Sequence, residues 1–450
     1  PAGGATLHSV ADGSGAGSVT VNLTPLSELI VALAAGGDAA TLFADFDAAA
    51  QAKIAASALA TARTTIASAL AGVVDLSGID PLKDALVAAN GSTAGNAFDQ
   101  KLDALNDALH AAKTDIAKLQ ALIAANGASA AEVIKTETRP TSATCKGVRS
   151  GAYRYINPNE TGDWSTHVVT YDASALTATL QDGTVLQLAS DGGCKFSYGP
   201  NVLVASSAGV VIERYVDTGD TARVAMAIPE QTLALSDLMG TWNTIYLTPA
   251  NAGATFAGGN SVVTMDAAGN MTAALDCTRA EPCTPRANVT GTFSVNASGG
   301  FDYVNEGQTS RVFAYRAASG DTMFAMLLPF NLGVIVGTKQ APLAVPSAGT
   351  STYWDLTVNA MDQVLALSDQ ATVNTPNGDG ATYTSVRQSD GRVVVYTMNK
   401  PRDGLRYRPD SNLGTPTYAN ALITLPIRGM GLSFYIGETV HLFGVSVLKS

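Results

Sequence analysis

The apolar positions along the chain follow two different periods, and the change between them falls near Pro140. Before this point apolar residues recur at alternating steps of three and four, which is the period of amphipathic helices. After it, short runs of alternating apolar and polar residues are separated by Gly, Asn, Asp and Pro, which is typical of antiparallel strands. The pattern therefore predicts a helical N-terminal region followed by an all-β region of about 310 residues.

The helical region begins with a clear start signal at Thr24. Thr24 fits an N-cap, Pro25 the first helical position and Glu28 the first turn. A later apolar stripe predicts one final helix that ends at Asn126-Gly127, and it consists of Leu102, Leu105, Leu109, Ala112, Ile116, Leu119 and Ile123. We interpret the stripe as packing inside a local helical bundle, with a coiled-coil surface for a partner as the alternative.

Two short segments of this region resemble sequences from a known group of proteins. They are Val21-Asn22-Leu23-Thr24-Pro25-Leu26-Ser27-Glu28-Leu29 and Ile79-Asp80-Pro81-Leu82-Lys83-Asp84. Residues 18–130 as a whole resemble the helical region of large bacterial secreted or cell-surface lipoproteins. The resemblance implies a location at the bacterial surface. It implies no activity and no functional residues, because most members of that family have no known function.

Three similar strand starts divide the β region into units. They are Gly151-Ala152-Tyr153, Gly240-Thr241-Trp242 and Thr352-Tyr353-Trp354, each with an aromatic residue near the start of a strand. Units of about 90 to 110 residues with frequent turn signals indicate small antiparallel barrels or sandwiches. We expect Tyr153, Trp242 and Trp354 to occupy equivalent buried positions in three similar folds.

The Gly-x-Trp segment at Gly240 to Trp242 is also similar to the opening of lipocalin-type barrels. This similarity implies that one or more interiors hold a small apolar ligand. We interpret the interiors as filled by the protein's own side chains, and a ligand cavity is the alternative.

The predicted fold class is therefore α plus all-β, with an N-terminal helical bundle followed by three antiparallel barrel-like or sandwich-like repeats. The predicted boundaries are 1–22 for an N-terminal strand or linker, 23–138 for the helical domain, and 139–235, 236–345 and 346–450 for the three β units.

The four cysteines predict two disulfides. No Cys-x-x-Cys pair is present and the four histidines are scattered, so a zinc site is not expected. The predicted pairs are Cys145 with Cys194 and Cys277 with Cys283. Disulfides persist in oxidising compartments, so we expect an exported bacterial protein that is extracellular or attached to the cell surface.

The charge of the chain limits its partners. A formal net charge of −11 opposes binding to nucleic acid, and no apolar run is long enough for a membrane-spanning helix. The main basic cluster, Lys400-Pro401-Arg402 with Arg406 and Arg408, is interpreted as a solvated turn, with a specific anion site as the alternative. Because the chain begins at Pro1 without a basic-then-apolar leader, we expect a processed product or a fragment.

Motifs for catalysis and cofactors are missing from the sequence. There is no Gly-x-Ser-x-Gly, and the loop from Asn374 to Gly380 lacks the acidic spacing of a calcium loop. We therefore predict no catalytic, cofactor or metal site. The remaining candidates are aromatic residues in loop-like stretches that could stack on a ligand, namely Trp164, Tyr155, Tyr198, Tyr407 and Tyr418.

The function predicted from these observations is that of a non-enzymatic bacterial surface protein with a structural or assembly role, whose main partner is a second copy of itself. The first alternative is a surface ligand-binding protein that holds a small apolar molecule or a glycan in a lipocalin-like barrel or an aromatic cleft. The second alternative is an unrecognised secreted hydrolase.

Overall fold

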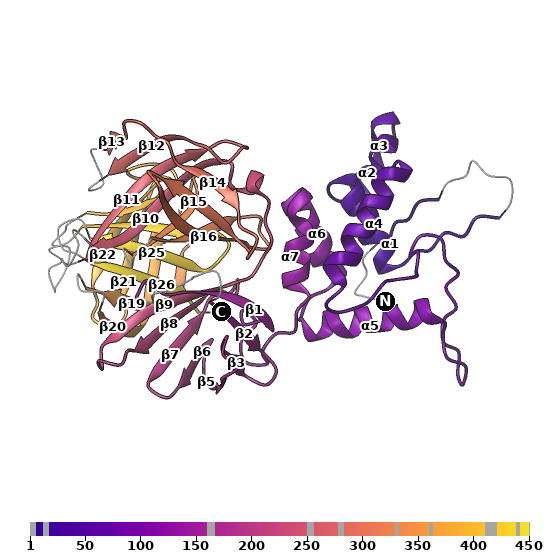
Figure 1. The fold of residues 1–450 in the computed structure, drawn as a ribbon, viewed down its shortest axis with the longest axis horizontal. Coiled ribbons are helices and arrows are strands. Elements are labelled where there is room, and N and C mark those ends of the chain that lie inside the picture. Colours follow the sequence, from indigo (N-terminus) through magenta and orange to yellow (C-terminus); the bar gives the residue numbers. More distant parts are fainter. Residues whose placement is uncertain are drawn as a thin grey trace. The chain divides into compact units, whose positions relative to one another are not determined.

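The computed structural model describes residues 6–11, 18–159, 167–249, 256–277, 283–328, 333–359, 363–409, 421–437 and 442–449. The chain divides into two compact units, a helical unit of residues 1–141 with 318–320 and a β unit of residues 142–317 and 321–450 (Figure 1). The predicted fold class is confirmed, because helices are followed by three antiparallel β structures. The five predicted domain boundaries stay a prediction.

The helical unit starts where the sequence predicts. Thr24 Oγ1 accepts the backbone N–H of Ser27 at 3.1 Å, Ser27 Oγ accepts that of Thr24 at 2.9 Å, and Gly36 closes the first helix with φ 72°. The helices are α1 (Pro25–Ala35), α2 (Ala39–Ala44), α3 (Ala48–Lys53), α4 (Ala56–Leu70), α5 (Ala97–Ala111), α6 (Ile116–Asn126) and α7 (Ala130–Glu137), with a 3-10 turn at Gly127–Ser129. Their apolar faces form one buried core.

The single final helix predicted over residues 102–123 is wrong, because the chain breaks there into α5 and α6. Lys113 adopts a positive φ of 52°, and the carboxylate of Asp115 caps α6 by accepting the backbone N–H of Lys118 at 2.8 Å. The stripe continues across the break because both helices bury their apolar faces in the same core. Periodicity thus reported burial correctly and helix continuity incorrectly.

The β unit contains two nine-stranded antiparallel sheets and one closed barrel. The first sheet consists of β1 (Gly151–Ile156), β2 (Val168–Asp172), β3 (Thr177–Thr179), β4 (Val185–Gln187), β5 (Ala189–Gly192), β6 (Lys195–Tyr198), β7 (Asn201–Ala205), β8 (Val211–Val216) and β9 (Ala222–Pro229). The second consists of β10 (Gly240–Pro249), β11 (Phe256–Met265), β12 (Met271–Cys277), β13 (Cys283–Pro285), β14 (Thr292–Val295), β15 (Phe301–Asn305), β16 (Gln308–Arg316), β17 (Thr322–Leu327) and β18 (Val334–Lys339), preceded by a 3-10 turn at Leu235–Leu238. The barrel consists of β19 (Gly349–Val358), β20 (Val364–Pro376), β21 (Thr382–Arg387), β22 (Val393–Met398), β23 (Arg406–Arg408), β24 (Leu422–Ile427), β25 (Leu432–Gly437) and β26 (Phe443–Leu448).

All three β structures share one topology, in which the first strand pairs with both the second and the last. β1 pairs with β2 and β9, β10 with β11 and β18, and β19 with β20 and β26. In the two sheets this ring is open, since β4 and β5, and likewise β13 and β14, are the outer strands. In the third structure the ring is closed into a barrel.

Tyr153 and Trp242 occupy equivalent buried positions in the two sheets. Each lies two residues after the glycine that starts its first strand, and each side chain is 0% exposed. Each also donates a hydrogen bond to the carbonyl four residues earlier, Tyr153 Oη to Arg149 at 3.1 Å and Trp242 Nε1 to Leu238 at 2.7 Å. This part of the prediction is confirmed.

The prediction for Trp354 is wrong. The barrel starts at Gly349, so the position two residues later is Ser351 and not Trp354. Trp354 is half-buried on the outer face of the barrel, where its Nε1 donates to the carbonyl of Gly193 at 3.2 Å and the ammonium of Lys449 lies 3.8 Å from its ring centroid. Pairing with the last strand also excludes Trp354, because Tyr153 lies opposite Pro229, Trp242 opposite Lys339 and Tyr353 opposite Leu448 at the end of that strand.

One hydrophobic core is shared by the two sheets and the barrel. It includes Ile212, Met226, Phe313, Leu327, Phe434 and Val445. The opposite faces of the two sheets have apolar cores of their own, around Tyr153, Tyr171 and Phe196 in the first and around Trp242, Phe293 and Phe324 in the second. The barrel, in contrast, contributes its apolar outer face to the shared core.

The predicted disulfides are present. Cys145 is bonded to Cys194 and Cys277 to Cys283. Within the described segments no helix is long and apolar enough to cross a membrane, and no cluster of His, Cys, Asp or Glu could hold a metal ion.

Candidate functional site

The barrel β19–β26 encloses a cavity of about 610 Å³. Successive residues of a strand point to opposite faces, so alternate residues line the cavity. On β19 these are the polar residues Ser351, Tyr353, Asp355 and Thr357, while Leu356 between them packs into the shared core. Polar side chains therefore face inward and apolar ones outward, whereas the two sheets bury apolar side chains on both faces. The interpretation that the interiors are filled is wrong for this barrel.

Four arginines face the cavity from neighbouring strands. Arg387 ends β21, Arg392 directly precedes β22, and Arg406 and Arg408 lie on β23 on either side of Tyr407. Burial lowers the pKa of Arg392 and Arg408 below its usual value, but a guanidinium stays protonated in proteins. The cavity wall is thus strongly cationic in a chain that is acidic as a whole.

Two carboxylates accompany these arginines. Asp390 forms a hydrogen-bonded ion pair with Arg387 and lies 3.6 Å from Arg392, and the hydrogen bond from Arg387 holds the pKa of Asp390 well below its usual range. Asp355 accepts hydrogen bonds from Tyr435 Oη at 3.2 Å and Ser446 Oγ at 2.7 Å, and burial raises its pKa. Two acids therefore stand against four cations, and one of the two is shifted toward its neutral form.

Arg406 lies against a pair of stacked tyrosines. Its guanidinium carbon is 4.7 Å from the ring centroid of Tyr396, and its Nη1 donates to Tyr383 Oη at 2.8 Å. The two rings are stacked with centroids 5.1 Å apart, and burial raises the pKa of Tyr383 to about 12. The Nε of Arg406 is buried and has no hydrogen-bond partner among the described residues. A planar guanidinium held in this way can bind carboxylate, phosphate or sulfate oxygens.

The interpretation of the basic cluster around Arg402 as a solvated turn is wrong. Arg406 and Arg408 line the cavity. Arg402 is buried against the second sheet, where its Nε donates to Asn243 Oδ1 at 2.9 Å, its Nη1 lies 3.4 Å from Cys277 Sγ, and burial lowers its pKa to about 10. The alternation Arg406-Tyr407-Arg408 is a strand signal that could have placed both arginines on one face.

The raised pKa of Asp355 predicts a pH effect on stability. The folded protein keeps this carboxyl protonated to a higher pH than the unfolded chain, in which its pKa is near 3.8. The contribution of Asp355 to stability is therefore lost as the pH rises from about 3.8 through the higher pKa of the folded state. We expect Asp355→Asn, which cannot ionise and keeps one acceptor oxygen of the two that Tyr435 and Ser446 use, to lack this loss. Urea midpoints of both proteins at about pH 4 and about pH 7 measure it. The same change of the urea midpoint between the two pH values in both proteins would contradict the role of Asp355.

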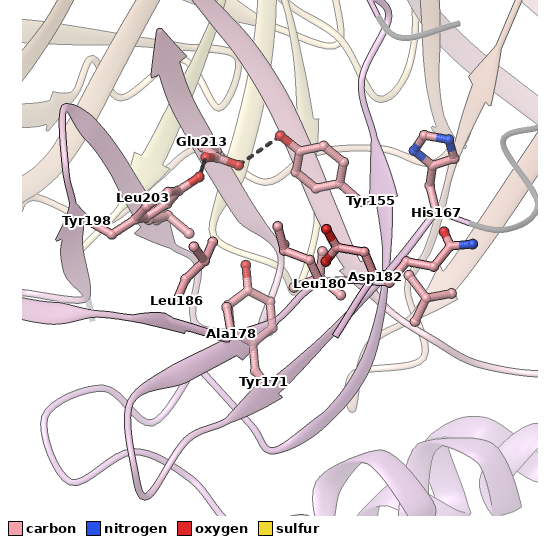
Figure 2. A pocket seen from close by; sticks show the side chains of 13 residues that line it. Tyr155, His167, Tyr171, Ala178, Leu180, Asp182, Leu186, Tyr198, Leu203 and Glu213 are labelled. Carbon is pink, nitrogen blue, oxygen red and sulfur yellow. Dashed lines mark hydrogen bonds between the residues drawn. The ribbon is translucent and has the colours of Figure 1, made fainter. Parts of the chain in front are cut away.

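The first sheet contains a second pocket of about 390 Å³ (Figure 2). Two of the aromatic residues singled out from the sequence line it, Tyr155 on β1 and Tyr198 at the end of β6. Both lie on strands and not in the loops that the sequence suggested, because the alternation of side chains between the two faces of β1 and β6 extends through them. Tyr155 Oη donates to Glu213 Oε2 at 2.9 Å, and Tyr198 Oη donates to Glu213 Oε1. The structure thus brings together two candidates that are 43 residues apart in sequence.

The other aromatic candidates lie elsewhere. Tyr407 is on the outer face of the barrel, where it packs against the shared core and the ammonium of Lys400 lies 5.3 Å from its ring centroid. Trp164 and Tyr418 lie outside the described residues. A stacking role for any of these aromatics stays a prediction.

Comparisons with known proteins add little. No family model matches the chain, and no curated protein matches its sequence. A protein of unknown function from the DUF3598 family of Nostoc punctiforme is 8% identical over 48% of this chain and 98% of its own, with a TM-score of 0.18. The N and C lobes of intact Ap-TbpB are 9% identical over 63% and 66%, with a TM-score of 0.18. Isotype 1 transferrin binding protein B from serogroup B Neisseria meningitidis is 8% identical over 63% and 58%, with a TM-score of 0.21. At these values the likeness carries no argument, and the resemblance of the helical region to surface lipoproteins stays a prediction.

Proposed function

We propose that the protein is an exported ligand-binding protein whose barrel β19–β26 binds an anionic ligand. The observation that supports this proposal is the polar interior of the barrel, with four arginines on the wall of its cavity and its apolar face packed outward. The ligand-binding alternative from the sequence is therefore preferred, but with a charged ligand in place of an apolar one.

The topology does not require arginines in its interior. The interior of the second sheet is packed with apolar and aromatic side chains, so the same topology can be filled without charge. Burying cations costs free energy unless partners compensate, and the acids present do not balance them. Perturbed charged groups that converge on a cavity are typical of binding sites.

The wall also indicates what kind of anion fits. The guanidinium groups match carboxylate, phosphate or sulfate oxygens, and the stacked rings of Tyr383 and Tyr396 offer a flat surface beside them. Val394, Leu422 and Leu448 supply an apolar patch. A cavity of about 610 Å³ is in the range of sites for small organic molecules. We infer a small organic acid with an apolar or aromatic part.

Two disulfides support export, because such bonds persist in oxidising compartments. A location at the cell surface is part of the proposal. The structural and assembly role, with a second copy of the chain as partner, stays a prediction, as do the glycan and hydrolase alternatives.

Titration calorimetry with a panel of organic acids tests the proposal, and anilinonaphthalene sulfonate serves as a fluorescent probe of the same chemistry. We expect Arg406→Gln and Arg408→Gln each to weaken binding roughly tenfold, because each removes a charge-assisted hydrogen bond. The control is Arg286→Gln, which removes an arginine that is paired with Asp276 on the second sheet, away from the cavity. The control should bind like the parent protein.

The opposite result is also defined. If methyl esters bind as tightly as the free acids, or if the two cavity variants bind like the control while retaining the parent circular dichroism, the barrel is not an anion site. Absence of binding by every acid in the panel would contradict the proposal as well.

A further inference from the structure

The pocket of the first sheet has the opposite character from the barrel cavity. Its polar lining consists of Tyr155, Tyr171, Tyr198, His167 and Gln181 together with the acids Glu213 and Asp182 (Figure 2). No lysine or arginine is among the described residues that line it. Aromatic rings and carboxylates therefore meet in one concave site of about 390 Å³.

Glu213 is the central charge of this pocket. It is 5% exposed, and the hydroxyls of Tyr155 and Tyr198 donate to its two oxygens, as Figure 2 shows. Burial, and after it the charge of Glu213, raises the pKa of Tyr171, and burial also raises that of Tyr198. The tyrosines are thus neutral at physiological pH, and Tyr155 and Tyr198 donate their hydroxyl protons to Glu213 in hydrogen bonds.

The fold does not require a carboxylate at this position. Tyr155 pairs with Ala227 on β9, and Glu213 on β8 pairs with Ala225, two residues earlier on the same strand. In the second sheet Thr244 corresponds to Tyr155, because each lies two residues after the fully buried aromatic residue of its first strand. Thr244 pairs with Gly337 on β18, and Ile335, two residues earlier on that strand, pairs with Met326 on β17. Met326 is buried and belongs to the apolar core of that sheet. The first sheet therefore holds a costly buried acid at a position where an apolar side chain suffices.

We propose that this pocket binds a small organic ammonium ion, with Glu213 as its counter-charge and the rings of Tyr155, Tyr171 and Tyr198 as its walls. Cations are attracted to the faces of aromatic rings, and a carboxylate at the base of such a site adds direct charge attraction. A second wall of aliphatic side chains, including Leu180, suits the methyl or methylene groups of such a ligand. This inference is independent of the anion site in the barrel.

Calorimetric titration of the full chain with choline and with tetramethylammonium tests the inference. We expect both to bind, and the uncharged carbon isostere of choline to bind about tenfold more weakly or not at all. Glu213→Gln has nearly the same shape and should weaken ammonium binding about tenfold or more. Tyr155→Phe keeps the ring and should have a smaller effect.

Two further proteins keep the test decisive. Glu213→Met reproduces the residue of the second sheet, so it provides a second variant without the charge if Glu213→Gln fails to fold. Arg406→Gln alters only the barrel and should leave ammonium binding unchanged, whatever it does to anion binding. The inference is overturned if neither ammonium ion binds, if the neutral isostere binds equally well, or if folded Glu213 variants keep the parent affinity. Tyr155, Tyr198 and Glu213 would then form only a structural hydrogen-bond network.

Discussion

Trp242→Ala is expected to destabilise the protein by about 3–5 kcal/mol, the range for removing a large buried aromatic side chain. Trp242 is fully buried, its ring lies 5.0 Å from that of Phe324, and its Nε1 donates to the carbonyl of Leu238. The substitution opens a cavity in the core of the second sheet and leaves this carbonyl without its donor. Urea unfolding followed by circular dichroism measures the change.

The matched control is Trp354→Ala, which removes the same side chain from the outer face of the barrel. Trp354 is only half-buried; it packs partly against the shared core and contacts Gly193, Lys195 and Lys449. We expect a loss of about 1 kcal/mol, the usual size for a partly exposed position. If both variants lost the same free energy, the assignment of Trp242 as an interior residue and Trp354 as an exterior one would be wrong.

Removal of the disulfide Cys145–Cys194 is the second large effect. The bond joins residues 49 positions apart, so it restricts a long loop of the unfolded chain, and we expect the double alanine variant to lose about 4 kcal/mol. Both cysteines are also buried in the core of the first sheet, where their loss removes packing. Unfolding of the oxidised parent and the variant under the same conditions gives the difference.

The second disulfide provides the comparison. Cys277 and Cys283 are 6 positions apart, and the same loop-entropy argument gives about 2 kcal/mol for their removal. A larger loss for the short loop than for the long one would show that native-state packing outweighs the restriction of the unfolded chain.

Much of the fold could be predicted from local sequence features. The change of period near Pro140, the cap at Thr24 and the glycines before Tyr153 and Trp242 are each interpretable from short segments. Such signals report local conformation and burial. They do not report continuity across a break such as the one at Lys113, because both neighbouring helices bury the same stripe.

The candidate site could not be predicted in the same way. The alternating polar residues of β19, such as Asp355 and Thr357, have the pattern of a strand with one solvent-facing side. Only the pairing of β19 with β26, over 80 residues away, turns that side into the lining of a closed cavity. The alignment on Trp354 failed for a related reason, since the pairing with the last strand places Tyr353, and not Trp354, at the position of Tyr153 and Trp242.

The polar interior and apolar outer face of the barrel have a consequence for how the protein can change in evolution. Along β23 the two arginines face the cavity while Tyr407 packs against the shared core, so neighbouring positions have separate roles. Under the proposed function, substitutions at the inward positions would alter the ligands that bind without loosening the contact that holds the barrel to the two sheets. Alternate residues of one strand would thus determine specificity and stability separately, so that one property can change in evolution while the other is kept.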